Sequence, residues 1–162
     1  MIGLDETTIG KAYLRMDSAL FDAPRFIYEN DDQPELEYLF LGTHHEPALK
    51  VTPCLVKPSE ATRLWRAKPE WQDKAVVLVS DECMPVVAGH LRSLLSVQLP
   101  EGGFSYLRFY APKQLQRLMS ALNEQERNRL NGPVRGWLVF KPAGEITRFG
   151  AGGGQMIPNG RA

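Results

Sequence analysis

The six residues 75–80, Ala-Val-Val-Leu-Val-Ser, constrain the fold more than any other segment. A strand that is apolar at nearly every position buries both of its faces, which is typical of the interior of a sheet covered on both sides. The segment after it predicts an amphipathic helix, because its apolar residues recur at steps of three and four. These residues are Met84, Val87, Ala88, Leu91, Leu94 and Leu95. The buried strand and the amphipathic helix together predict a domain in which helices pack on a sheet.

The rest of the chain adds further strands and helices around this unit. Strands are predicted at residues 13–17, 36–42, 52–58 and 134–140, with a hairpin at 96–110 that turns at Gly102 and Gly103. Helices are predicted to begin at Ser18 or Asp22, at Ser59, at Pro112 and at Asn123. Asn123 and Glu126 have the spacing of a capping box. The fold class that results is mixed α/β (α+β), one domain over residues 1–140 with a mixed sheet flanked by helices.

Residues 141–162 are predicted to form a flexible, glycine-rich tail. The run from Gly150 to Gly154 could suggest a phosphate-binding loop. A phosphate-binding loop leads into a helix, and in one type of loop a Lys-Ser or Lys-Thr pair begins that helix. This run leads instead to Met156-Ile157-Pro158. We therefore expect no bound nucleotide.

The charge pattern argues against nucleic acid or an anionic membrane as a partner. Lysine and arginine number 19, and aspartate and glutamate also number 19, so the net charge is zero. The charge is unevenly distributed, with a net −6 over residues 1–40 and +5 over residues 101–162. Two interpretations stay open: the two ends face each other or separate partners, or they form ordinary solvated surfaces.

The sequence predicts a cytoplasmic protein. Its start, MIGLDETTIGK, has no basic segment followed by an apolar one, and no apolar run approaches the roughly 18 residues of a membrane span. Two cysteines, Cys54 and Cys83, do not make a disulfide framework.

No combination of residues predicts catalysis, a metal site or a cofactor. His44 and His45 are adjacent, and no further His or Cys follows at a ligand spacing. Cys83 and His90 are seven residues apart, about two helical turns or ~10 Å, which is too far for a thiol–imidazole hydrogen bond. We expect a protein that is not an enzyme.

A protein-binding surface is the better-supported expectation. His90 and Arg92 lie on opposite borders of the apolar stripe of the predicted helix, and Arg108 and Tyr110 share one face of a strand. Arg and Tyr are enriched at protein interfaces, although both also serve as ordinary internal contacts. The two interpretations stay open for these four residues.

The segment from Val76 to Phe140 resembles the type VI secretion effector chaperones, or adaptors, a family long described as a domain of unknown function. Three elements in order carry the resemblance: His90-Leu91-Arg92, the stretch LRFYAPK at 107–113, and Gly132-Pro133. More loosely, residues 13–17 and TPCLVKP at 52–58 resemble the family's N-terminal strands. The resemblance covers most of residues 10–140.

The chain departs from the family pattern at one element. Where the family has Asp-Pro-Arg, this chain has Ala111-Pro112-Lys113. Ala111 loses a helix-capping bond worth about 1 kcal/mol. Lys113 keeps the charge and loses bidentate pairing, and we include it with the tentative protein-binding residues.

The resemblance implies a non-enzymatic adaptor that binds one cognate secreted toxic effector and helps to load it onto a VgrG-type spike protein. No cofactor is implied, and neither nucleic acid nor a membrane is an expected partner. Two alternatives remain: an immunity-type or regulatory protein-binding module, and a small enzyme that uses Cys83 or His90.

Overall fold

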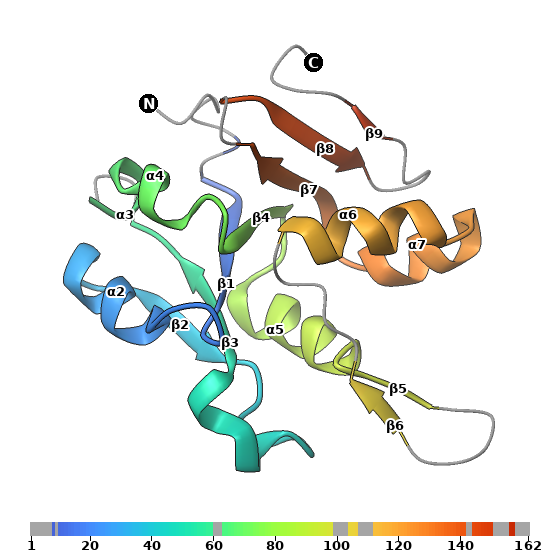
Figure 1. Ribbon diagram of the computed structural model, residues 1–162, viewed down its shortest axis with the longest axis horizontal. Helices are drawn as coiled ribbons and strands as arrows, with labels where there is room; N and C mark the ends of the chain where they lie inside the picture. Colours follow the sequence, from blue (N-terminus) through green and yellow to red (C-terminus); the bar gives the residue numbers. More distant parts are fainter. Residues whose placement is uncertain are drawn as a thin grey trace.

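Strand β4 (Ala75–Ser80) is the middle strand of a seven-stranded sheet in the computed structural model of the chain (Figure 1). The structure describes residue 8 and residues 10–59, 63–98, 104–106, 112–141, 144–150 and 156–157. In spatial order the strands are β2 (Glu35–Tyr38), β3 (Pro53–Lys57), β1 (Ala12–Asp17), β4, β7 (Val134–Phe140), β8 (Ile146–Gly150) and β9 (Met156–Ile157).

Helices cover both faces of this sheet (Figure 1). On one face lie α2 (Ala23–Asn30), α3 (Arg63–Arg66) and α4 (Lys68–Trp71), and on the other lie α5 (Met84–Ser93), α6 (Pro112–Ala121) and α7 (Glu124–Asn131). Strands β5 (Ser96–Gln98) and β6 (Phe104–Tyr106) pair as a separate hairpin, and the 3₁₀ helix η1 (Glu46–Val51) precedes β3. The prediction of a mixed α/β fold is confirmed.

The central strands divide their side chains between two cores. Ala12, Leu14 and Met16 of β1 pack with α2, α3 and α4, while Tyr13 packs with α5, α6 and α7. In β4, Ala75 and Val77 join the first core and Val76 and Leu78 the second. This alternation is the period of two that a strand imposes, and it explains why residues 75–78 are all apolar.

The sheet is antiparallel at every pairing of the described strands, so the expected mixture of parallel and antiparallel pairs is not found there. Continuous apolar runs are most common in parallel sheets, because those are normally covered on both faces. Here an antiparallel sheet is covered on both faces, which produces the same sequence signature.

A register shift between β4 and β7 places Arg135 at the surface. Val79 pairs with Gly136 and Ser80 pairs with Val134, so Arg135 is an extra residue on β7. A bulge of this kind turns the following side chains to the opposite face. Val134 and Trp137 therefore both contribute to the second core although they are three residues apart.

The predicted helix after Ser59 differs from the observed structure. The described residues form two four-residue helices, α3 and α4, and Leu64 and Trp65 are buried as expected. Pro69 was expected to follow the helix, and it lies in the first turn of α4, where a missing N–H costs nothing. Ser59 instead hydrogen-bonds through its backbone N–H and hydroxyl to the carboxylate of Asp31.

The predicted flexible tail from residue 141 is wrong for residues 146–150. These residues form β8, which pairs with β7 from Phe140↔Ile146 to Gly136↔Gly150. Ile146 and Phe149 are each 3% exposed and join the two cores. The two apolar residues of ITRFG are three positions apart and face opposite sides of the sheet, so no simple alternation of apolar and polar residues marks this strand. Residues 151–155 and 158–162 lie outside the described part of the chain.

None of the described helices is long and apolar enough to cross a membrane.

The predicted capping box is confirmed and provides a test of local stability. The Asn123 side chain accepts the backbone N–H of Glu126 at 2.8 Å, and the Glu126 carboxylate accepts the backbone N–H of Asn123 at 2.9 Å. We expect Asn123→Ala to lower the free energy of unfolding by about 1 kcal/mol in urea denaturation. Gln125→Ala, an exposed change in the same helix, is the control and should stay within about 0.5 kcal/mol. Equal losses for both variants would contradict the capping role.

Candidate protein-binding site

His90, the first residue of the predicted site, is an internal contact between α5 and the end of α7. Its Nε2 lies 2.7 Å from the carbonyl oxygen of Leu130. A Cβ added at Gly132 would lie 2.3 Å from the His90 ring, and Gly132 has a positive φ of 48°. Only glycine therefore fits at position 132 without displacing the ring.

The surroundings of His90 favour its neutral form. Burial lowers the pKa of the imidazole, and the positive charge of Arg15 acts in the same direction. The hydrogen bond to the Leu130 carbonyl opposes this shift. Because a carbonyl accepts, the neutral ring carries its proton on Nε2.

Arg92, the second predicted residue, holds α5 against the edge strand β2. Its Nη2 lies 2.9 Å from the Glu37 carboxylate and donates to the carbonyl oxygen of Tyr38 at 2.9 Å. Because the Arg92 guanidinium donates to the Tyr38 carbonyl, it also occupies part of the edge of β2. His90 and Arg92 thus flank one helix and bind different elements of the same domain.

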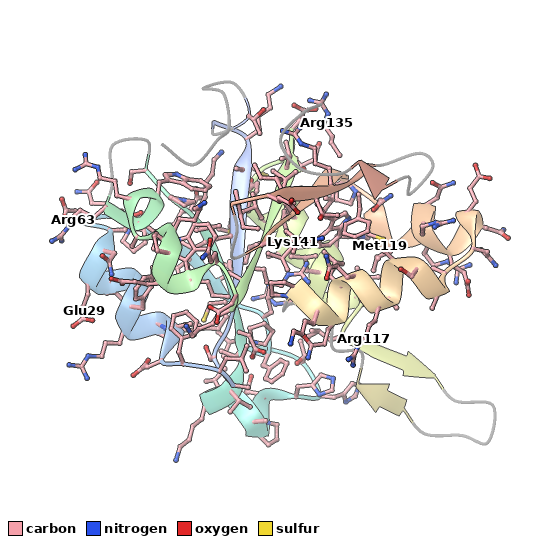
Figure 2. All side chains as sticks on the ribbon, turned by 45° about the horizontal axis from the view of Figure 1, so that its top comes forward. Glu29, Arg63, Arg117, Met119, Arg135 and Lys141 are labelled. Atoms are coloured by element: carbon pink, nitrogen blue, oxygen red, sulfur yellow. The ribbon has the colours of Figure 1, made fainter. Side chains whose placement is uncertain are left out.

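The three other predicted residues do not join them within the described structure. Lys113 is exposed in the first turn of α6, and Arg108 and Tyr110 lie outside the described residues. On α6, Met119 is buried and Arg117 is exposed, and Figure 2 shows the two side chains leaving the helix in different directions. The assignment of these residues to a partner surface stays a prediction.

Sequence reasoning missed a buried arginine beneath this helix layer. Arg15 on β1 is 1% exposed, and its guanidinium carbon lies 5.1 Å from the centre of the Trp137 ring. Trp137 donates its indole N–H to the Asn131 side chain at 2.7 Å. The only signal was an arginine between two apolar residues of the strand AYLRMD, a position that its charge alone would place at the surface.

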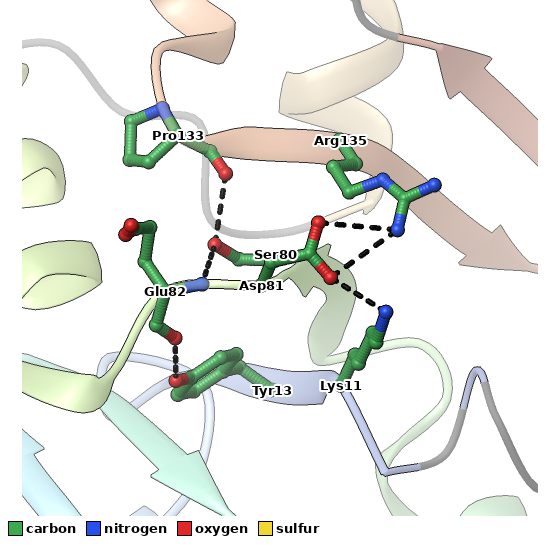
Figure 3. Close-up of polar contacts among 7 residues, drawn as sticks. All are labelled: Lys11, Tyr13, Ser80, Asp81, Glu82, Pro133 and Arg135. Atoms are coloured by element: carbon green, nitrogen blue, oxygen red, sulfur yellow. Dashed lines mark hydrogen bonds and ion pairs between the residues drawn. The ribbon is translucent and has the colours of Figure 1, made fainter.

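The turn from β4 to α5 is fixed by a surface ion cluster (Figure 3). Asp81 lies 2.6 Å from Lys11 and 3.2 Å from Arg135. The hydrogen bond from Lys11, helped by the charge of Arg135, lowers the pKa of the Asp81 carboxyl. The cluster connects the end of β4 with β1 and β7, so we assign it a structural role.

Two hydroxyl groups hold the backbone of the same turn (Figure 3). Tyr13 donates to the carbonyl oxygen of Glu82 at 2.6 Å, and burial raises the pKa of its phenol to about 12. Ser80 donates to the carbonyl oxygen of Pro133 at 2.8 Å and accepts the N–H of Glu82 at 3.1 Å. Helix α5 therefore starts from a fixed position relative to the sheet.

Within the described structure the cysteines and histidines form neither a thiol–imidazole pair nor a metal site. Cys54 is buried, and burial raises the pKa of its thiol to about 11, which keeps it protonated at neutral pH. Cys83 is exposed at the N-cap of α5, whereas His90 is directed to Leu130. Among the described residues no three His, Cys, Asp or Glu side chains gather as a metal site.

A surface pocket of about 550 Å³ opens between α2 and η1. Its lining residues come from the β1–α2 loop, the start of α2, the end of β2, and η1 with the residue after it: Ser18, Phe21, Asp22, Pro24, Tyr38, Leu49, Lys50 and Thr52. This volume lies within the range of roughly 300–1,000 Å³ that is typical of ligand sites. No signal for it was found in the sequence, because its walls come from three separate segments of the chain.

Exposed apolar side chains adjoin this pocket. Leu49, in its wall, is 36% exposed, and Leu20 and Val51, next to lining residues along the chain, are 47% and 42% exposed. Helix η1 has no buried residue at all. Apolar side chains around a pocket are typical of a protein-interaction surface.

These features define a small mixed α/β domain with an antiparallel sheet between two helix layers and, at its surface, a pocket lined by both apolar and polar residues. The chain belongs to the family described as a domain of unknown function (DUF4123), whose model matches residues 12–129. The match ends within α7, so β7, β8 and β9 complete the sheet beyond it. No curated protein and no solved structure shows a significant match to the chain.

The buried position of His90 predicts a pH dependence of stability. Its pKa in the folded chain is below 6.5, its usual value, so the unfolded chain binds a proton more readily. The contribution of the neutral ring is complete above pH 6.5 and is lost as the pH falls from there toward the lowered pKa. We expect His90→Gln, whose amide can still donate to Leu130, to flatten this decline in urea denaturation between pH 7 and 5. The control His44→Gln, at an exposed position, measures how far the loss of a histidine elsewhere in the chain alters the slope. A slope that His90→Gln does not alter would contradict the assignment.

The contacts of Arg92 predict a loss of stability on truncation. Charged hydrogen bonds contribute about 1.5–3 kcal/mol, and this one is partly exposed, so we expect Arg92→Ala to cost about 1–2 kcal/mol. Thermal and urea unfolding measure the loss, with Arg129→Ala in α7 as the exposed control. Unfolding curves for Arg92→Ala that coincide with those of the unmodified protein would show that this connection contributes nothing.

Proposed function

We propose that this protein is a non-enzymatic, cytoplasmic adaptor that binds a cognate type VI secretion effector and promotes its loading onto a VgrG-type spike protein. Two lines of argument support the proposal: membership of the DUF4123 family, and the resemblance of three sequence elements to the effector adaptors. The observation that carries it in the structure is the surface pocket between α2 and η1, with exposed leucine and valine side chains around it.

An adaptor needs a surface that binds firmly and still releases its cargo. Exposed apolar side chains such as Leu20 and Leu49 are stabilised when a partner covers them, at about 25 cal/mol per Å² of apolar area removed from water. A pocket with a few such side chains around it fits an interface of ordinary or small size, which is common in transient complexes. Loading followed by release requires this intermediate strength.

The distribution of charge suits two partners. Glu29 and Glu35, on α2 and β2, are exposed at one end of the sheet, whereas Lys113 and Arg117 are exposed on α6, on the face of the sheet opposite α2. Charged surfaces of this kind contribute to orientation and association rate more than to affinity. Cargo and spike could thus be recognised at separate sides of the same domain.

The first test is a pull-down of tagged protein from the native cell, with identification by mass spectrometry. We expect recovery of a toxic effector together with a VgrG-type spike protein. Leu49→Asp places a charge at the pocket and should reduce effector recovery at least tenfold, because burial of a leucine is worth about 1.5–3 kcal/mol. Val86→Asp is the matched control, since Val86 is 46% exposed on α5 and lines no part of this pocket.

The outcomes separate the candidate functions. Recovery of neither an effector nor a spike protein, from cells that express the type VI apparatus, would contradict the adaptor. An immunity-type module would instead neutralise a toxin in the compartment where the toxin acts, so co-expression with the captured protein distinguishes the two. Circular dichroism and thermal unfolding confirm that both aspartate variants are folded.

A further inference from the structure

The charges of helix α6 destabilise the helix itself, whereas those of its neighbour α7 stabilise it. Lys113 lies in the first turn of α6, where the helix dipole favours a negative charge. Arg117 follows at the i,i+4 spacing, which brings two like charges together, and α6 contains no acidic residue. In α7 the order is favourable, with Glu124 and Glu126 in the first turn and Arg129 in the last. In natural proteins such conflicts between sequence and local structure concentrate at functional sites.

The three cations lie at one end of the α6–α7 pair. The two helices are side by side and are connected only by Leu122 and Asn123, so they run antiparallel (Figure 1). The first two turns of α6 therefore lie beside the last turn of α7, and Lys113, Arg117 and Arg129 are all exposed. We infer that this basic end binds a short acidic segment of a partner protein. The inference rests on the proposed function only for the identity of that partner.

The positive charge of this basic end is not neutralised within the described part of the chain. None of the ion pairs found there includes Lys113, Arg117 or Arg129. The acidic residues of the pair, Glu124 and Glu126, belong to its opposite end, about 12 Å from Lys113 along the helix axis. The basic end therefore favours a negatively charged ligand.

The position of the two glutamates limits the length of that ligand. A nucleic acid carries a negative charge at every phosphate, so a strand that followed the pair of helices would meet Glu124 and Glu126. A short acidic segment of a protein can contact the cations and end before these carboxylates. Exposed ion pairs contribute to orientation and association rate more than to affinity, which suits a partner that is later released.

The first test measures the stability of the free protein. Lys113→Glu places an acid in the first turn of α6 and pairs it with Arg117 in the favourable orientation, so we expect the Tm to rise by about 2–4 °C. Lys141→Glu, an exposed change of the same charge after β7, is the control and should give no such rise. An unchanged or lowered Tm for Lys113→Glu would show that the charges of α6 are not in conflict with the helix, and the inference would lose its basis.

The second test measures binding to the full-length, ¹⁵N-labelled protein at low ionic strength. The probe is a capped peptide of three glutamates between glycines, and the comparisons are the same peptide with lysines and a short single-stranded oligothymidylate. We expect the acidic peptide to shift amides of α6 and of Arg129 and to leave Tyr28, on the opposite face of the sheet, unchanged. Lys113→Glu and Arg117→Glu should each weaken it about two- to fivefold, and Lys141→Glu should not.

Three results would overturn the inference: no shifts on α6, equal binding of the lysine peptide, or tighter binding of the oligothymidylate than of the acidic peptide. The peptide titration does not depend on secretion. A native pull-down that recovers no effector would contradict the proposed function and leave the titration unaffected, so the two failures are distinguishable.

Discussion

The burial of β1 and β4 on both faces is the constraint on which the rest of the structure depends. Leu14 and Val77 face one core, whereas Tyr13 and Val76 face the other, and all four are fully buried. Neither face can be left to solvent without exposing several apolar side chains, each worth about 1.5–3 kcal/mol when buried. The chain must therefore provide a helix layer on each side, and α2 and α5 are the first helices of the two layers.

The position of α5 follows from polar contacts at each of its ends. At its start, Tyr13 and Ser80 hold the backbone near Glu82, and near its end Arg92 binds the carbonyl of Tyr38. Between them the apolar stripe lies on the sheet, and His90 reaches across to α7. Because these partners lie on β1, β2 and α7, the helix connects elements from most of the chain.

The fold was largely predictable from periodicity, and the candidate site was not. Residues 75–80 and the stripe beginning at Met84 indicated their structures because each buries a regular set of positions. Strand β8 was missed because its five residues lead directly into a glycine-rich stretch that suggested flexibility. Arg15 was missed because a charged residue between apolar neighbours looks like a surface position. The pocket could not be found at all, since Ser18, Tyr38 and Lys50 meet only after the chain has folded.

Two of the three elements that carry the family resemblance have structural roles in the described part of this chain. His90 and Gly132, from two of the three elements, are in contact across 42 positions, and Arg92, from the first, joins α5 to β2. Such contacts maintain the relative position of the helices, and they do so whatever the domain binds. Recognition of one cognate partner requires side chains that are free to change without loss of the fold. Exposed residues such as Leu49 and Lys50, on a 3₁₀ helix that buries nothing, meet that requirement. The contacts of His90, Arg92 and Gly132 therefore maintain the fold of this chain, and the proposed function assigns partner recognition to the surface between α2 and η1.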